Sequence, residues 1–147
     1  MKRHKCLTEL SKDHHDGLIL AQIIKKNSPP YKNMPQDLSG KKEYTLDFYN
    51  RGLIKHFMEE EEILIPFVAG KDYVLDKLCN RVKEEHAQMR SLMKNLEEEN
   101  DTEEILNKMG IILEKHIRME EREFFELIQK ILSEKSLNEL EQRLTRK

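Results

Sequence analysis

The chain has 147 residues, of which 37% are charged, yet the formal net charge is only −2. Acidic and basic residues are interleaved, so the composition shows no basic patch for nucleic acid and no block of like charge typical of a disordered tail. The longest apolar runs fall far short of the ~20 residues that span a bilayer. We therefore expect one domain over residues 1–147, with no membrane segment and enough length for a substantial core.

The two cysteines, Cys6 and Cys79, lie far apart and form no Cys-x-x-Cys motif. The basic first residues are followed by polar ones rather than by the apolar core of a secretion signal. We therefore expect no disulfide framework, and the pattern favours a reducing cytoplasm.

Helical periodicity recurs along the chain, while five glycines, four prolines and the lack of long alternating segments leave little room for strands. The first helix is expected over about residues 4–26, where Asn27-Ser28-Pro29-Pro30 stops it, and residues 31–40 form a connection. The second helix is expected over about residues 42–68 and ends near Gly70.

Asp72 can cap a third helix, whose apolar stripe extends from Leu75 to Leu96. The next break is Asn100-Asp101-Thr102, in which Asp101 or Thr102 is the expected N-cap of a fourth helix ending at about residue 132. Residues 136–144 carry leucines at helical spacing and form a short appended helix.

Short links after the second and third helices favour antiparallel neighbours. The predicted fold is all-α: an up-down-up-down antiparallel four-helix bundle over about residues 4–132, followed by the short C-terminal helix.

One pattern occurs twice: a histidine followed four residues later by a glutamate, as His56–Glu60 and His116–Glu120. Residues four apart on a helix differ by about 40° in direction, so imidazole and carboxylate converge on one face. Both pairs fall within an apolar stripe, where an unpaired carboxylate costs several kcal/mol. Neither stripe carries a lysine or arginine, and a cation from solution is the simplest partner.

The first and third helices also offer histidines that can face the centre of a bundle. His86 is the sole histidine of the third helix and lies on or beside its apolar stripe. On the first helix His14 and His15 compete, and His14 is favoured because His15 is turned about 100° away from the stripe. His4 is expected to be solvated, as is the glutamate run 59–62 apart from Glu60.

Imidazole and carboxylate ligands without a thiolate suit iron, manganese or zinc. Two glutamates can bridge two metal ions, which leaves two histidines for each ion and open positions for a small molecule. The candidate ligands are His14, His56, Glu60, His86, His116 and Glu120.

The sequence resembles the hemerythrin-like family of metal-binding domains, known as HHE cation-binding domains, over nearly its whole length. The resemblance is carried by residues 10–15, 56–66, 85–86 and 116–120. It implies a non-haem di-iron centre, with oxo or hydroxo and carboxylate bridges, that binds dioxygen or reacts with oxygen, peroxide or nitric oxide. The four histidines would then be terminal ligands and the two glutamates would bridge.

The chain departs from the oxygen-carrying members of that family at two places. Those members have a second histidine four residues from the one on the third helix, where this chain has Val82 and Arg90. They also place the last carboxylate five residues after the last histidine, whereas Glu120 follows at four. The four-histidine set is more similar to the branches linked to iron sensing and iron-centre repair.

The leading hypothesis is a cytoplasmic di-iron protein that binds, senses or reacts with dioxygen, peroxide or nitric oxide. The alternative is an interaction module without catalysis, in which metal binding stabilises the fold and a partner reads the folded state. The appended helix either packs on the bundle, which is favoured, or forms the surface for a protein partner or a homodimer. A metal-free helical domain is a third reading. A ferritin-like ferroxidase is disfavoured, because that class uses Glu-x-x-His pairs.

Overall fold

The computed structural model describes residues 2–98 and 101–145 and contains no strand within these ranges. Its helices are α1 (Lys5–Ile24), α2 (Leu38–Phe48), α3 (Ile54–Glu59), α4 (Ile65–Val68), α5 (Tyr73–Glu97), α6 (Thr102–Met119), α7 (Phe125–Ile131) and α8 (Glu134–Thr145). Three π-helical turns continue these helices without a break: η1 (Tyr49–Leu53), η2 (Glu60–Leu64) and η3 (Glu120–Phe124). The predicted all-α class is confirmed.

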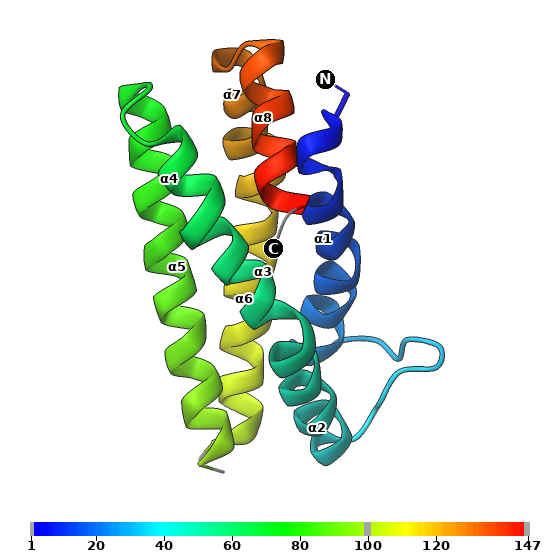
Figure 1. Cartoon of the computed structure of the whole chain (residues 1–147). Helices are drawn as coiled ribbons and strands as arrows, with labels where there is room; N and C mark the ends of the chain where they lie inside the picture. The colour runs from blue at the N-terminus through cyan, green and yellow to red at the C-terminus, as the bar shows by residue number, and fades with distance from the viewer. Residues whose placement is uncertain (1, 99–100, 146–147) are drawn as a thin grey trace.

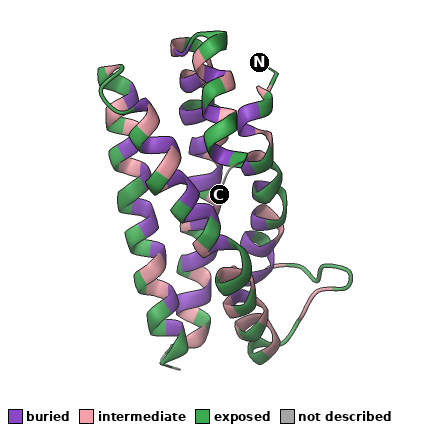
Figure 2. Ribbon diagram, viewed as in Figure 1, coloured by how far each residue is buried: buried purple, intermediate pink, exposed green. Residues whose placement is uncertain are grey.

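The long helices stand side by side, and α8 folds back along α1 (Figure 1). α6 packs against both α1 and α5, and buried residues, purple in Figure 2, recur along all three helices. None of the described helices has both the length and the apolar character needed to cross a membrane.

The apolar core is divided into two clusters, one at each end of the helices. The first includes Leu10, Val82 and Met119, and the second includes Leu20 and Met89. Along α1, α5 and α6 a buried histidine lies between members of the two clusters. The fold therefore holds a polar layer between two apolar halves.

Several helix ends differ from the predicted ones. α1 ends at Ile24 rather than near residue 26. α2 begins at Leu38, four residues before the predicted start, with Asp37 at the N-cap position, where its backbone carbonyl accepts the N–H of Lys41 at 3.0 Å. Gly40 lies inside this first turn, where a Cβ atom would come within 2.6 Å of the Asp37 side chain. The glycine therefore permits a tight helix start instead of marking a loop.

The N-terminal caps agree only in part with the prediction. Asp72 caps α5 by accepting the Leu75 N–H. Asp101 takes the N-cap position of α6 with a left-handed backbone, and Asn100 of the predicted break lies outside the described residues. The solvated reading of His4 is wrong, because His4 caps α1 by accepting the Cys6 N–H at 3.0 Å.

The appended helix α8 is longer than predicted, and its apolar face is covered by the rest of the molecule. Leu137, Leu140 and Leu144 are buried in the cluster that contains Leu10. The packed arrangement that the sequence favoured for this helix is therefore the one that the structure shows.

Close packing of α6 on α1 depends on a glycine, and this generates a prediction. A Cβ atom at Gly110 would lie 2.8 Å from the backbone oxygen of Ala21. We expect Gly110→Ala to lower the free energy of unfolding by roughly 1–3 kcal/mol, as overpacked cores do, when measured by chemical denaturation.

Gly52→Ala is the matched control, since a Cβ atom there meets no other atom within 4 Å. Alanine at this helical position should stabilise the chain by up to about 1 kcal/mol. A Gly110→Ala variant as stable as Gly52→Ala would contradict the close α1–α6 contact.

Candidate metal centre

The polar layer is built from the six side chains that the sequence singled out. His14 lies on α1, His86 on α5 and His116 on α6, while the two repeated pairs supply the remaining residues from α3, η2 and η3. All six side chains are buried, and both glutamates are 0% exposed. His15 is exposed, so the structure places His14 in the layer and His15 outside it.

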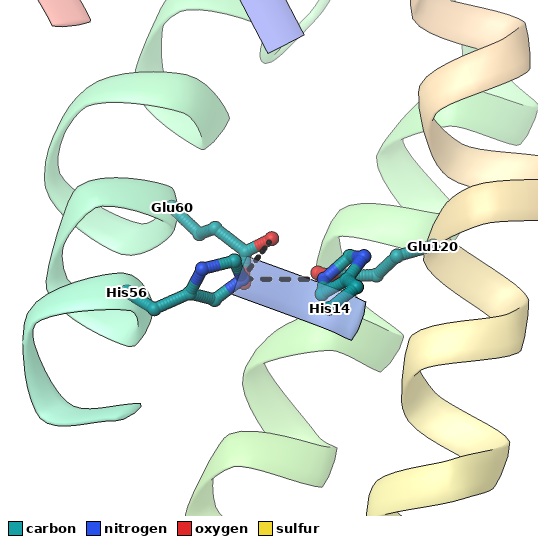
Figure 3. Close-up of side chains that lie close together, drawn as sticks. All are labelled: His14, His56, Glu60 and Glu120. Carbon is teal, nitrogen blue, oxygen red and sulfur yellow. Dashed lines mark hydrogen bonds and ion pairs between the residues drawn. The ribbon is translucent and has the colours of Figure 1, made fainter. Parts of the chain in front are cut away.

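The six side chains form two groups that share both glutamates. One group is His14, His56, Glu60 and Glu120, and the other is Glu60, His86, His116 and Glu120. Within each group the candidate ligand atoms lie within 4.8 Å of one another. Figure 3 shows the first group, with residues of α1, α3, η2 and η3 pointing toward one another.

Each glutamate contacts histidines from two different helices. Glu60 lies 3.5 Å from His56 Nε2 and 3.0 Å from His86 Nε2. Glu120 lies 3.4 Å from His116 Nε2 and 2.8 Å from His14 Nε2. All four imidazoles therefore direct the same ring nitrogen, Nε2, at the two carboxylates.

Most of these inward atoms have no hydrogen-bond partner. Nε2 of His56, His86 and His116, both carboxylate oxygens of Glu60 and Oε2 of Glu120 are buried and unsatisfied. Buried polar groups in native proteins are almost always paired, so orphans that face one another indicate a missing ligand. Nitrogen and oxygen donors in this arrangement fit a metal-binding site.

The outward nitrogen of each histidine is held by a second carboxylate. Nδ1 of His14 lies 2.7 Å from Glu121, and Nδ1 of His86 lies 2.5 Å from Glu61. The other two pairs are His56 with Asp13 at 3.0 Å and His116 with Glu85 at 2.7 Å. A carboxylate that accepts Nδ1–H leaves the Nε2 lone pair facing inward, which is the arrangement of histidine ligands in metalloproteins.

Sequence reasoning missed these four outer carboxylates. The solvated reading of the glutamate run 59–62 is wrong for Glu61, which binds His86. The sequence did contain a signal for them, because each outer carboxylate is directly adjacent in sequence to a candidate ligand. Asp13 and Glu85 directly precede a histidine of the layer, and Glu61 and Glu121 directly follow a glutamate of the layer.

A π-helical turn begins at each of the two inward glutamates. The Ile65 N–H donates to the Glu60 carbonyl, and the Phe125 N–H donates to the Glu120 carbonyl, five residues apart in both cases. Single π turns within α-helices occur frequently at functional sites. Here each turn starts with one glutamate that points into the layer and a second that binds a histidine of a neighbouring helix.

Protons can take the place of a cation in this layer. Burial alone would lower the pKa of His116, but Glu120, Glu85 and Glu60 outweigh it and raise that pKa to about 10. The pKa of His56 is also raised well above its ordinary value, against its burial, by Glu60, Asp13 and Glu120. Burial would raise the pKa of Glu120, yet the surrounding imidazoles, His116 foremost, hold it well below its usual range.

A small cavity of about 130 Å³ adjoins the layer. His14, His56 and His116 border it together with apolar side chains such as Leu53 and Ile117. The share of liquid volume that one water occupies is about 30 Å³, so the cavity suits a few water-sized molecules. Pockets for ordinary organic ligands measure about 300–1,000 Å³.

These pKa shifts predict how the stability of the metal-free protein depends on pH. A histidine whose pKa is raised on folding stabilises the fold fully below its unfolded value of about 6.5 and loses that contribution as pH rises through the folded value, about 10 for His116. We expect the chelator-treated protein to lose stability steadily between pH 6.5 and 9 in urea denaturation.

His116→Gln is the control for this measurement, because it lacks the titrating group and should show a shallower pH dependence. A metal-free wild-type protein equally stable at pH 6.5 and 9 would rule out protonated histidines as the counter-charge of the glutamates.

Comparison with models of protein families matches residues 7–128 to the hemerythrin HHE cation binding domain. All six side chains of the polar layer lie within the matched range. Searches of curated proteins and of solved structures returned no match. The family match covers most of the chain, and the chain therefore belongs to the hemerythrin HHE cation-binding domain family.

Proposed function

We propose that the polar layer binds two iron ions as a non-haem di-iron centre. His14 and His56 hold one ion, His86 and His116 hold the other, and Glu60 and Glu120 bridge them. The observation that carries this proposal is the pair of four-residue groups that share both glutamates and direct unpartnered atoms at one another. Manganese or zinc can substitute, because they accept the same nitrogen and oxygen donors.

The proposed scaffold for this centre is a single domain over residues 1–147, an up-down-up-down antiparallel four-helix bundle with α8 appended. The contacts of α6 with α1 and α5 support this arrangement, as does the placement of one histidine of the layer on each of α1, α3, α5 and α6. Bundles of this kind build metal sites from side chains on facing helices.

The function we propose is to bind, sense or react with dioxygen, peroxide or nitric oxide. Bound iron supplies the redox and ligand-binding chemistry. The chain supplies four imidazoles oriented by outer carboxylates, two bridging carboxylates, and an apolar cavity beside three of the histidines. The volume of about 130 Å³ supports a ligand of two or a few atoms and disfavours a larger organic substrate.

The alternative, a metal-stabilised module that only signals its folded state to a partner, uses the same six residues. It gives no role to a cavity that reaches the histidines, and the cavity therefore favours the first function. We propose that the protein acts in the cytoplasm, because Cys6 and Cys79 are free, buried thiols in keeping with a reducing compartment.

Metal analysis tests the proposed centre. Protein purified without chelators or a metal-binding tag, then loaded anaerobically, should contain two iron ions per chain, one for each group of ligands. Exposure to oxygen should produce an iron-dependent near-ultraviolet absorption band. His14→Ala should lose iron and most of that band, since it removes a ligand.

His15→Ala is the matched control on the same helix, one residue away and exposed. It should bind as much iron as the wild-type protein. A wild-type chain that takes up no metal on reconstitution, or equal iron in the two alanine variants, would contradict the proposed ligand set.

The cavity generates a separate prediction about access. Gly52 borders the cavity, and a side chain there starts in open space. We expect Gly52→Leu to slow oxidation of the iron-loaded protein by oxygen and peroxide severalfold in stopped-flow absorbance, without changing iron content. Gly52→Ala adds a single methyl group and should react at nearly the wild-type rate. Equal rates for Gly52→Leu and the wild-type protein would show that small molecules reach the centre by another path.

A further inference from the structure

Two arginines far apart in sequence each bind an outer carboxylate of the polar layer. Arg90 of α5 donates to both oxygens of Glu61, at 2.9 and 3.1 Å, and Glu61 holds Nδ1 of His86. Arg3, which precedes α1, donates to one carboxylate oxygen of Glu121 at 3.2 Å and to the Glu121 backbone carbonyl at 2.9 Å, and the Glu121 carboxylate holds Nδ1 of His14. Each arginine therefore binds a carboxylate that itself contacts a candidate metal ligand.

A phenylalanine completes each of these sets. The Arg90 guanidinium lies 5.5 Å from the centre of the Phe57 ring, and that ring stacks on His86 with a centroid distance of 3.9 Å. The Arg3 guanidinium lies 5.5 Å from the centre of the Phe125 ring, which stacks on His14 at 5.6 Å with an interplanar angle of 9°. An arginine, a glutamate and a phenylalanine thus surround one histidine in each of the two groups of the layer.

The two sets contact histidines that belong to different groups of candidate ligands. His86 belongs to one group of candidate ligands and His14 to the other. Arg90 sits within a long helix, whereas Arg3 is fixed by Gln129, which accepts from the Arg3 guanidinium at 3.2 Å and from the backbone N–H of His4 at 2.9 Å. The segment before α1 is therefore tied to α7 in the position that brings Arg3 to Glu121.

The remaining two histidines are held differently. His116 is oriented by Glu85, which receives a single contact from Arg81 at 3.1 Å. His56 is oriented by Asp13, whose side chain is 57% exposed at the cavity and forms no ion pair with a lysine or arginine of the described chain. Among the described residues, only His14 and His86 stack on a phenylalanine ring whose arginine also binds their outer carboxylate.

We propose that Arg3 and Arg90 are positioning residues for the two metal ions, one for each ion. Each guanidinium binds the outer carboxylate and covers the phenylalanine, so that the imidazole is fixed in direction and keeps its proton on Nδ1. A guanidinium suits this task because its planar fork binds a carboxylate and stacks on a ring at once, which an ammonium does not do. This inference rests on the proposed di-metal centre.

Metal titration and nuclear magnetic resonance together test the proposal. Arg90→Gln and Arg3→Gln should each weaken the binding of one of the two ferrous ions in an anaerobic titration, by about tenfold, the lower end of the effect of removing groups that orient metal ligands. In the zinc-loaded, nitrogen-15-labelled protein, Arg90→Gln should shift the Nδ1–H resonance of His86 and leave that of His14 in place. Arg3→Gln should do the reverse.

Arg118→Gln is the matched control. Arg118 makes two contacts with one carboxylate, Glu114, at 3.1 and 2.9 Å, and that carboxylate holds no histidine of the layer. This control should change neither the titration nor the histidine resonances. Arg90→Lys and Arg3→Lys keep the charge and serve where a glutamine variant fails to fold; each should shift the same resonance as its glutamine counterpart.

Two results would overturn the proposal: arginine variants that match Arg118→Gln in both measurements, or variants that disturb all four histidine resonances equally. A wild-type protein that binds neither ferrous iron nor zinc would instead refute the di-metal centre itself, so the two failures are distinguishable.

Discussion

Two fully buried carboxylates surrounded by imidazoles are the constraint on which the rest of this structure depends. Glu60 and Glu120 lie at 0% exposure in the middle of the helices, and they face imidazoles instead of lysine or arginine. Ionised carboxylates in such a place require positive charge, because the cost of desolvation is several kcal/mol for each ion. Protons on the histidines, or metal ions between the side chains, are the two sources of positive charge for this layer.

The layer contains two copies of the same structural arrangement. A histidine precedes an inward glutamate by four residues, a π turn begins at that glutamate, and the next glutamate reaches a histidine on another helix. In each copy the histidine and its outer carboxylate come from different helices, so neither copy is complete without its neighbours. Packing of α1, α3, α5 and α6 and assembly of the centre are therefore one process, and metal binding would be coupled to folding.

The four histidines nevertheless differ in their surroundings. The cavity borders His14, His56 and His116, whereas His86 is covered by Phe57 and lies away from it. The outer carboxylates differ as well, because Asp13, which holds His56, is more than half exposed, while Glu85, which holds His116, is buried. Three of the four histidines of this layer therefore adjoin the cavity, while His86 is enclosed by packed side chains, so four similar imidazoles have unequal surroundings.

Helical periodicity alone is sufficient to locate most of the centre. The spacing of His56 from Glu60 and of His116 from Glu120 places each pair on one face, and the apolar neighbours show that the face is buried. The same reasoning separates His14 from His15. The predicted boundaries of α2 and α8 were less accurate, since a cap such as Asp37 and a close approach such as that at Gly40 leave little trace in hydrophobic periodicity.

By itself, then, the sequence determined that the chain is helical, that four histidines and two glutamates share its interior, and that nitrogen and oxygen donors suit iron, manganese or zinc. Those properties follow from residue type and from periodicity within single helices. The partners of the outer ring nitrogens, the cavity beside the histidines and the placement of Arg3 and Arg90 over two phenylalanine rings were decided by the tertiary structure. Each of these joins residues on different helices, and a helical pattern carries no information on which helix comes to lie against which.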